Sequence, residues 1–563
     1  MHAHDVLRDS PATPLRESPA TPLRESPATP PTVTALGHAG LRIDAPGVRL
    51  LADPWMTGGA FLGSWFPFPD NAHMHRPDVL DVDVVTVSHE HLDHLDLDLI
   101  AGLPAHVPIV VPRYPSPILE RRLRAAGRDR VVALDAWERY PLGNGGDDWL
   151  TVIPEQCPMR HDAGVLIHVG GHSVMHTNDA RISLAQVRRA MSEVGGPIDT
   201  MFVQMSGASW HPVCYEYDDA DRARLNAMKR VGKFKAVTRL VRSAAPRMVL
   251  PYAGPPCFLG DDLFEHNSRL DREGIFPDQA ESLAWLEQYL PRQRSAYLLP
   301  GDRLALPDLS VTRDAHWEGF DLDAPVERRR RYLEEYAARR RPQLDAIIAS
   351  HPEPAADSGL AELFKQHFES LGSLSAYFLA RIGLTLRFEV SGPAGGCWDV
   401  VVGPDQITVN LDGGDGHADY RLRIDSRWVE GLVSGRTRWE ELMLSLRFSA
   451  RREPDHYNDY LMGFLKHADL AALRAVEEFE AARDPYETFE LQLGERRARV
   501  SRYCPHSGED LSETAVVSGG VLRCLGHNFE FDLTTGECVN ARCDPLVVEP
   551  VDVAVAATAG AAR

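Results

Sequence analysis

Three histidines and one aspartate stand within six residues of each other, in the pattern His89, His91, Asp93, His94. An apolar segment, Val82–Val87, precedes them and predicts a buried strand. Where a strand runs into a tight loop, the first two histidines project together because alternate residues share a face, and the Asp-His pair turns toward them. Such crowding is costly unless a cation neutralises it, and imidazole and carboxylate groups are ligands of divalent metals. The pattern therefore predicts a metal site.

A second set of ligands lies near the end of the chain, at Cys504-Pro-His506 and Cys524-Leu-Gly-His527. One cysteine and one histidine in each of two loops is the ligand set of a Rieske [2Fe–2S] cluster, in which thiolates hold one iron and imidazoles hold the other. A zinc finger instead groups its cysteines in one pair and its histidines in another. Neither loop has the additional cysteine that forms a disulfide in respiratory Rieske proteins. The pattern favours a ferredoxin- or oxygenase-type cluster in a reducing compartment.

The elements that must position these residues divide into a tail and three folded domains. Residues 1–31 repeat a proline-rich octapeptide, which predicts an extended, disordered tail. Strands and helices alternate over residues 32–312, which predicts an α/β layered domain that carries the first metal site. Residues 313–478 are helical and then mix strands with helices, as in an α+β module. Residues 484–555 are rich in strands and contain the cluster loops, which predicts an all-β Rieske domain.

Composition and charge exclude several classes of protein. The 563 residues carry a formal net charge of −21, which argues against a non-specific nucleic-acid binder. No apolar run reaches the roughly 18 residues of a membrane span, and the N-terminus has no apolar leader, so we expect neither a membrane protein nor a secreted one. Eight cysteines are too few for a disulfide scaffold. These features predict a cytoplasmic protein, with a homo-oligomer left open.

The first site and its surroundings resemble the metallo-β-lactamase superfamily. Gly37-His-Ala-Gly40 and the loop at Asp53 match the superfamily's first strands and its aspartate loop. His176-Thr-Asn-Asp179 follows a predicted strand at the place of the superfamily's bridging aspartate. The resemblance implies an αββα sandwich in which Asp179 bridges two metals or completes one site.

The remaining ligands of that superfamily have no single counterpart here. Between the two motifs, where the superfamily usually has a histidine, the sequence offers Glu155 or His161. After the last predicted strand, residues 251–257 hold no histidine, and His266 lies some way beyond. The sequence leaves both choices open, and it assigns no catalytic residue apart from these candidate ligands.

A redox cluster joined to such a domain implies that the metal is iron and that electrons reach it, because a zinc hydrolase has no use for electrons. The chain resembles the CMP-N-acetylneuraminate hydroxylase family, which joins the same two domains, over about residues 33–475 and the cluster domain. The matching segments are Ala52–Phe61, Val87–His94, Gly171–Asp179, Pro251–Gly254 and Trp439–Leu442 through Arg452–Tyr457. That family places its Rieske domain first, whereas this chain places it last. Residues 385–465 also look like a sterol-carrier-type module.

This resemblance implies a Rieske-dependent monooxygenase. A ferredoxin with its reductase, or a similar electron donor, would reduce the [2Fe–2S] cluster, and electrons would pass to one or two non-haem irons that use O₂ to oxidise an organic substrate. An N-acyl sugar nucleotide, an amine and a natural-product intermediate are all compatible substrates. Two other classes remain open. One is a metal-dependent hydrolase or lactonase whose Rieske domain senses redox state, and the other is an electron carrier or scaffold with an incomplete first metal site.

Overall fold

The computed structural model describes most of the chain between residues 30 and 551. The described ranges are 30–143, 147–207, 209–270, 274–414, 416–482, 484, 486–493, 496–505, 508–525, 529–541 and 543–551. The predicted tail, apart from its last two residues, lies outside them, as do His506 and His527. Among the helices in these ranges, none has both the length and the apolar composition needed to cross a bilayer.

Two sheets packed face to face form the first part of the fold. The first sheet has eight strands, in the order β14 (Val311–Thr312), β13 (Arg303–Ala305), β1 (Thr32–Gly37), β2 (Gly40–Ala45), β3 (Val48–Ala52), β4 (Val84–Thr86), β5 (Ile109–Pro112) and β6 (Val131–Leu134). The second has six, in the order β12 (Met248–Tyr252), β11 (Thr200–Gln204), β10 (His172–His176), β9 (Ala163–Val169), β8 (Trp149–Pro154) and β7 (Arg139–Pro141). Their inner faces share one apolar core, to which Val33 and Leu50 contribute from one sheet and Val165 and Ile167 from the other.

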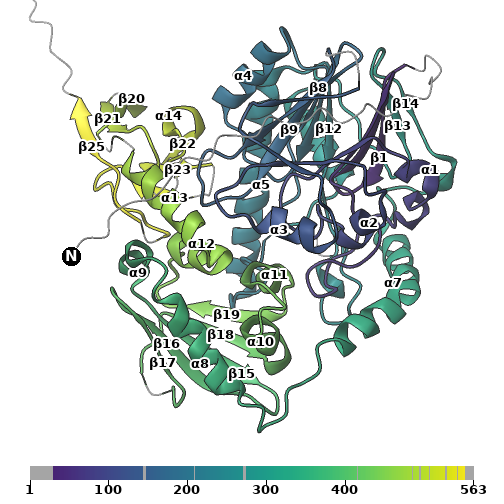
Figure 1. The fold of residues 1–563 in the computed structure, drawn as a ribbon. Coiled ribbons are helices and arrows are strands. Elements are labelled where there is room, and N and C mark those ends of the chain that lie inside the picture. The colour runs from purple at the N-terminus through teal and green to yellow at the C-terminus, as the bar shows by residue number, and fades with distance from the viewer. Residues whose placement is uncertain are drawn as a thin grey trace, which may run out of the picture.

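Helices cover the outer face of each sheet. The helices of this part are α1 (Pro77–Leu80), α2 (Leu97–Gly102), α3 (Ile118–Ala125), α4 (Leu184–Glu193), α5 (Asp219–Ala244) and α6 (Gln279–Tyr289). Leu99 of α2 belongs to the core on the first sheet, and Phe234 of α5 belongs to the core on the second, which also contains Leu166 of β9. Because β9 is covered on both faces, its side chains are apolar in both directions. These layers confirm the predicted αββα sandwich (Figure 1).

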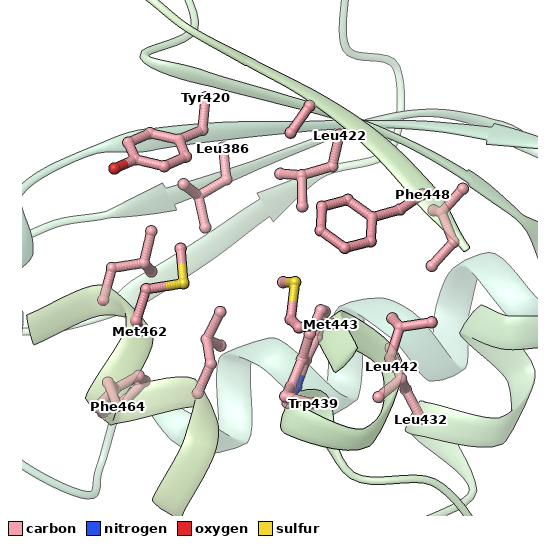
Figure 2. Packing of buried hydrophobic residues seen from close by; sticks show 14 of the residues in the cluster. Leu386, Tyr420, Leu422, Leu432, Trp439, Leu442, Met443, Phe448, Met462 and Phe464 are labelled. Atoms are coloured by element: carbon pink, nitrogen blue, oxygen red, sulfur yellow. The ribbon is translucent and has the colours of Figure 1, made fainter. Parts of the chain in front are cut away.

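An α+β module follows the sandwich. It contains the helices α7 (Val326–Ala349), α8 (Leu360–Leu371), α9 (Ala376–Ile382), α10 (Ser426–Val433), α11 (Trp439–Leu444), α12 (Asp459–His467) and α13 (Leu470–Ala481). Its sheet has the order β17 (Ile407–Asn410), β16 (Gly396–Val402), β15 (Thr385–Ser391), β18 (Tyr420–Asp425), β19 (Phe448–Arg452). Figure 2 shows Leu386 and Phe448 of the sheet facing Met462, Met443 and Trp439 of the helices. The module therefore has an apolar core between its sheet and its helices.

The last part consists of two small sheets and one short helix. The sheets are β20 (Thr488–Leu493), β21 (Arg496–Ser501), β25 (Val548–Val551) and β22 (Ala515–Ser518), β23 (Val521–Cys524), β24 (Glu530–Asp532), and α14 spans Leu511–Thr514. We call this part the cluster domain. Figure 1 shows it beside α12 and α13, with the sheet of the module below. A β-bridge between Tyr457 and Ala541 joins the module to it, and a bridge between Tyr215 and Ala450 joins the sandwich to the module. The predicted domain limits stay predictions.

Candidate metal centre and cluster domain

The carboxyl ends of neighbouring parallel strands bring the candidate ligands together. β3 pairs in parallel with β4, and Asp53 and Ser88 follow these two strands. Ser88 donates to Asp53 from its backbone N–H, at 2.7 Å, and from its hydroxyl, at 2.6 Å. β10 likewise pairs in parallel with β11, and the Gln204 amide at the end of β11 donates to Asp179. Loops at this end of parallel strands are the usual ligand-binding place in α/β folds.

Three groups of histidine nitrogens and carboxylate oxygens lie there, and the ligand atoms of each group are within 4.8 Å of one another. The groups are His89, His91 and Asp162, then His89, His94 and Asp179, and lastly His38, Asp93 and His94. Because they share members, they form one continuous cluster, which we call the metal cluster. The structure therefore brings together all four residues of the sequence motif and Asp179. Their role as ligands stays a prediction.

His89 and His94 connect the three groups. His89 Nε2 lies 2.8 Å from His91 Nδ1 and 3.6 Å from Asp162 Oδ1. His94 Nε2 lies 3.3 Å from Asp179 Oδ1 and 3.8 Å from Asp93 Oδ2. In the third group, the distance between Nε2 of His38 and Oδ2 of the aspartate is 3.0 Å. Donor atoms thus converge at more than one place, and the arrangement can hold one or two metal ions.

The opposite ring nitrogen of each motif histidine has a partner outside the metal cluster. These pairs are His89 Nδ1 with Ser88 Oγ at 2.9 Å, His94 Nδ1 with Asp53 Oδ2 at 3.1 Å, and His91 Nε2 with Glu440 Oε2 at 3.0 Å. Outer partners of this kind fix the tautomer and the direction of a metal-binding imidazole. The three rings are therefore already aimed with one nitrogen toward the cluster.

Glu440 belongs to α11 of the module and not to the sandwich. Its second oxygen lies 2.9 Å from Nζ of Lys466 on α12, and both side chains are 9% exposed. The adjacent Glu441 pairs with Arg122 of α3. The module thus forms one wall of the metal cluster.

Several buried atoms of the metal cluster lack a hydrogen-bond partner among the described residues. They include His94 Nε2, Asp93 Oδ1 and Asp162 Oδ1. Leaving a buried polar group unsatisfied costs roughly 1–3 kcal/mol, so three such atoms in one place call for a ligand. A divalent cation would satisfy them, and a set of nitrogen and oxygen donors without sulfur suits non-haem iron as well as zinc. The residues present therefore fit a metal.

Charges in the metal cluster are strongly coupled. Burial opposes protonation of His94, but the carboxylates of Asp179 and Asp93 outweigh it and raise the pKa of His94 well above its ordinary value. Burial would raise the pKa of Asp179, yet His94 holds it far below the usual range. Burial and the neighbouring histidines lower the pKa of His89 to about 4. The cluster thus contains ionised carboxylates and a neutral His89, the forms that bind metals, together with a protonated His94 that a bound cation would deprotonate.

Glu155 and His161, the two alternatives for the ligand between the motifs, lie outside the three groups. His161 Nδ1 is 3.7 Å from Glu90 Oε1. A carboxylate oxygen of Glu155 accepts the backbone N–H of Arg181 at 2.7 Å. The residue beside the histidines is instead Asp162, immediately after His161. The choice between Glu155 and His161 stays a prediction, and Asp162 is a further candidate.

His266 lies on a short 3₁₀ helix and packs its ring edge against Phe258, with centroids 6.3 Å apart. It belongs to none of the three groups. Besides Asp162, two further residues near the motif histidines have no role in the sequence-based prediction. His38 stands in a matched segment and occupies the turn between β1 and β2, with φ of +48°. Glu440 also stands in a matched segment, but nothing there indicates a partner in the sandwich.

Cys504 and Cys524 are fully buried in the core of the cluster domain. A backbone hydrogen bond joins each cysteine to a residue beyond its predicted histidine: Cys504 N–H donates to Glu509 O at 2.8 Å, and Cys524 N–H donates to Phe529 O at 2.9 Å. Their predicted partners His506 and His527 lie outside the described residues.

One cluster loop approaches the metal cluster through the module. Phe529 packs edge-on against Tyr457, with ring centroids 6.1 Å apart. The Tyr457 hydroxyl donates to Asp459 Oδ1 at 3.1 Å, and Arg160 donates to the same oxygen at 2.7 Å. Arg160 is two residues before Asp162. A chain of contacts therefore runs from the second cluster loop to a candidate ligand.

The other cluster loop lies near the segment that follows Asp179. Burial raises the pKa of Glu509, and the positive charge of Arg181 partly opposes this rise. Arg188 of α4 donates to Glu513 of α14 at 2.6 Å. The cluster domain thus contacts the module at Tyr457 and the sandwich at α4 of the same chain.

Three family models match this chain. A beta-lactamase superfamily domain matches residues 48–237, an Rv3818-like, SCP2-like domain matches residues 360–482, and a Rieske [2Fe-2S] domain matches residues 467–550. The chain thus contains a metallo-β-lactamase-type domain, an SCP2-like domain and a C-terminal Rieske domain. This confirms the predicted fold class and the predicted [2Fe–2S] cluster domain.

A Mycolicibacterium smegmatis protein named as a Rieske 2Fe-2S iron-sulfur protein is 29% identical over 526 residues, which cover 91% of this chain and 98% of that protein. The cytidine monophosphate-N-acetylneuraminic acid hydroxylase of Danio rerio is 25% identical over 237 residues, 40% of this chain and 38% of that one. This confirms the resemblance drawn from the sequence motifs. Among solved structures, CmlA, a diiron beta-hydroxylase from Streptomyces venezuelae, aligns with a TM-score of 0.34 and 20% identity over 52% of this chain and 55% of that chain.

Proposed function

We propose that this protein is an oxidoreductase, namely a Rieske-dependent non-haem iron monooxygenase. One observation carries the proposal: a cluster of imidazoles and carboxylates without thiolate lies in the same chain as a Rieske domain that contacts both the sandwich and the module. A metal-dependent hydrolase needs no electron source. A redox domain that contacts the domains around the metal cluster therefore favours redox chemistry at that cluster. The hydroxylase among the relatives supports the same conclusion.

The chain's own residues have three roles in this proposal. His89, His91 and Asp162 on one side, and His94, Asp93 and Asp179 on the other, hold the metal, with His38 near the second set. Ser88, Asp53 and Glu440 hold the histidine rings in place. Iron bound there would supply activation of O₂ at the expense of two electrons and two protons, so that one oxygen atom enters a C–H bond of the substrate and the other leaves as water.

Electrons come from a donor such as a ferredoxin with its reductase. They enter at the [2Fe–2S] cluster and pass to the metal cluster within the same chain, because the contacts of Tyr457 with Phe529 and of Arg188 with Glu513 are intramolecular. The substrate is a small organic molecule, for which an N-acyl sugar nucleotide, an amine and a natural-product intermediate remain candidates.

The first test is the content of metal and acid-labile sulfide in full-length protein prepared anaerobically. We expect about two sulfides per chain, as a [2Fe–2S] cluster requires, with one or two irons beyond the cluster irons. Zinc in place of the additional iron, together with turnover that needs neither O₂ nor reductant, would replace the proposal by a hydrolase or lactonase with a redox-sensing domain. The metallo-β-lactamase-type domain gives that alternative its support.

A further inference from the structure

Two lysines of α5 lie beside the metal cluster and have no carboxylate partner among the described residues. Lys229 and Lys233 are one helical turn apart, so their side chains share a face of the helix. Both are partly buried. Their hydrogen-bond acceptors lie at the end of β11 and in the loop that follows it, and one of them, Gln204, contacts Asp179.

The ammonium groups donate only to neutral acceptors among the residues that the structure describes. Lys229 Nζ donates to the His211 carbonyl at 2.6 Å and to the Ser209 hydroxyl. Lys233 Nζ donates to Gln204 Oε1 at 2.5 Å. No ion pair with a described carboxylate is formed by either lysine, whereas other half-buried cations of this protein, such as Arg160, have one.

Gln204 links this pair of lysines to the metal cluster. Its carbonyl oxygen accepts from Lys233, and its amide donates to Asp179. The ammonium of Lys233 is therefore one side chain away from a candidate ligand. This location agrees with a substrate that has one end at the lysines and the other at the metal cluster.

Arg181 and Arg452 lie near the lysines and raise the free-energy cost of keeping the ammonium groups charged without an anion. Burial, with Arg181 and Arg452 nearby, lowers the pKa of Lys229 to about 7. Burial and Arg181 likewise lower the pKa of Lys233 to about 8, and the carboxylates of Asp179, Glu155 and Asp162, none of which pairs with the ammonium, partly oppose this shift. Cations that leave water are normally paired with an anion. In a chain of net charge −21, a concentration of positive charge beside the candidate site points to a negatively charged ligand.

We propose that Lys229 and Lys233 bind the anionic group, a carboxylate or a phosphate, of the organic substrate. The proposal rests on the proposed function, because it assumes that the molecule at the metal cluster is a substrate. Two ammonium groups one helical turn apart can each donate to a different oxygen of one carboxylate or phosphate. Binding of that group would replace the weak neutral acceptors and position the rest of the molecule near Asp179.

The test measures binding of inorganic phosphate and of acetate to anaerobically prepared, metal-loaded full-length protein by titration calorimetry. The variant is Lys229→Gln/Lys233→Gln, and the matched control is Lys235→Gln, which changes an exposed lysine of the same helix. We expect the wild type and the control to bind at least one of the two anions equally well. The double variant should bind that anion roughly 10- to 100-fold more weakly, the loss expected for charged hydrogen bonds. Whichever anion depends on the lysines identifies the group as carboxylate or phosphate.

Metal content measured on the same samples separates this proposal from the proposed function. Lysine-dependent anion binding to protein that carries zinc would retain the anion site and overturn the monooxygenase. Equal binding by all variants, or no binding by the wild type, would overturn the anion site whatever the metal. If the double variant does not fold, Lys233→Gln alone decides, because it keeps Lys229 and its contacts in the loop.

Discussion

The contact between Glu440 and His91 allows a quantitative test of how far the SCP2-like module contributes to the metal cluster. Glu440→Gln keeps the shape of the side chain and removes its charge. His91 Nε2 then loses a carboxylate at 3.0 Å, and Lys466 loses one at 2.9 Å. Burial opposes protonation of His91, and Glu440 is the main group that raises its pKa, to about 9. The substitution therefore removes the group that holds the proton on the outer nitrogen.

Removing an outer partner of a metal-bound histidine typically lowers metal affinity roughly 10- to 100-fold, which equals about 1.4–2.8 kcal/mol. We expect the upper end of that range, because both carboxylate oxygens of Glu440 have partners and all three side chains lie at or near the 9% exposure of the pair with Lys466. The assay is the rate and extent of iron transfer to a chelator in full-length protein. Absorbance of the [2Fe–2S] cluster reports that the Rieske domain remains intact.

Glu441→Gln is the matched control. Glu441 is the next residue of α11 and also joins the module to the sandwich, but it pairs with Arg122 instead of a candidate ligand. We expect this variant to retain iron like the wild type. If the two variants lose iron equally, Glu440 acts only by holding the domains together, and if neither loses iron, His91 needs no outer partner; both results would refute the reasoning.

Three further predictions follow from the metal cluster, the Rieske ligands and the lysine pair. Asp162→Asn should lower iron content more than Glu155→Gln does, since only the former residue lies beside the motif histidines; metal analysis of the two variants decides, and the reverse order would assign Glu155 as the ligand. His506→Ala should abolish reductant-driven turnover but leave iron at the metal cluster, as measured by stopped-flow reduction and metal analysis; iron lost together with the [2Fe–2S] cluster would contradict separate sites. Anion binding should weaken between about pH 6 and pH 9, because burial lowers the pKa of Lys229 to about 7 and only the protonated amine attracts an anion; calorimetry at a series of pH values would show a flat profile if the lysine is not involved.

The local parts of the fold and of the site could be predicted from the sequence because their signals are short. The apolar runs before the histidine motif and around β9 specify strands that are covered on both faces. The motif His89–His94 contains enough donors within six residues to indicate a metal without any knowledge of distant contacts. The same holds for the two cluster loops, each of which contains its own cysteine and histidine.

The remaining parts depend on geometry that no short segment encodes. Residues 155–162 join β8 to β9 and contain three possible metal ligands, Glu155, His161 and Asp162. Glu155 N–H donates to the Asp162 carbonyl at 2.9 Å, so the loop closes just before the strand. This closure places Asp162 at the strand end and leaves His161 beside Glu90. Glu440 lies about 350 positions beyond His91, and only docking of the module brings the two together.

The contribution of α11 and α12 to the metal cluster has a consequence for how the protein is made. A ribosome releases the metallo-β-lactamase-type domain first, because chains fold from the N-terminus during synthesis. At that stage His91 has no carboxylate behind it, since residues 440 and 466 have not yet been made. We therefore expect the site to bind iron tightly only after the module has docked, shortly before the Rieske domain itself is complete. In the proposed monooxygenase, this order of domains would complete the iron site only shortly before its electron supply is in place.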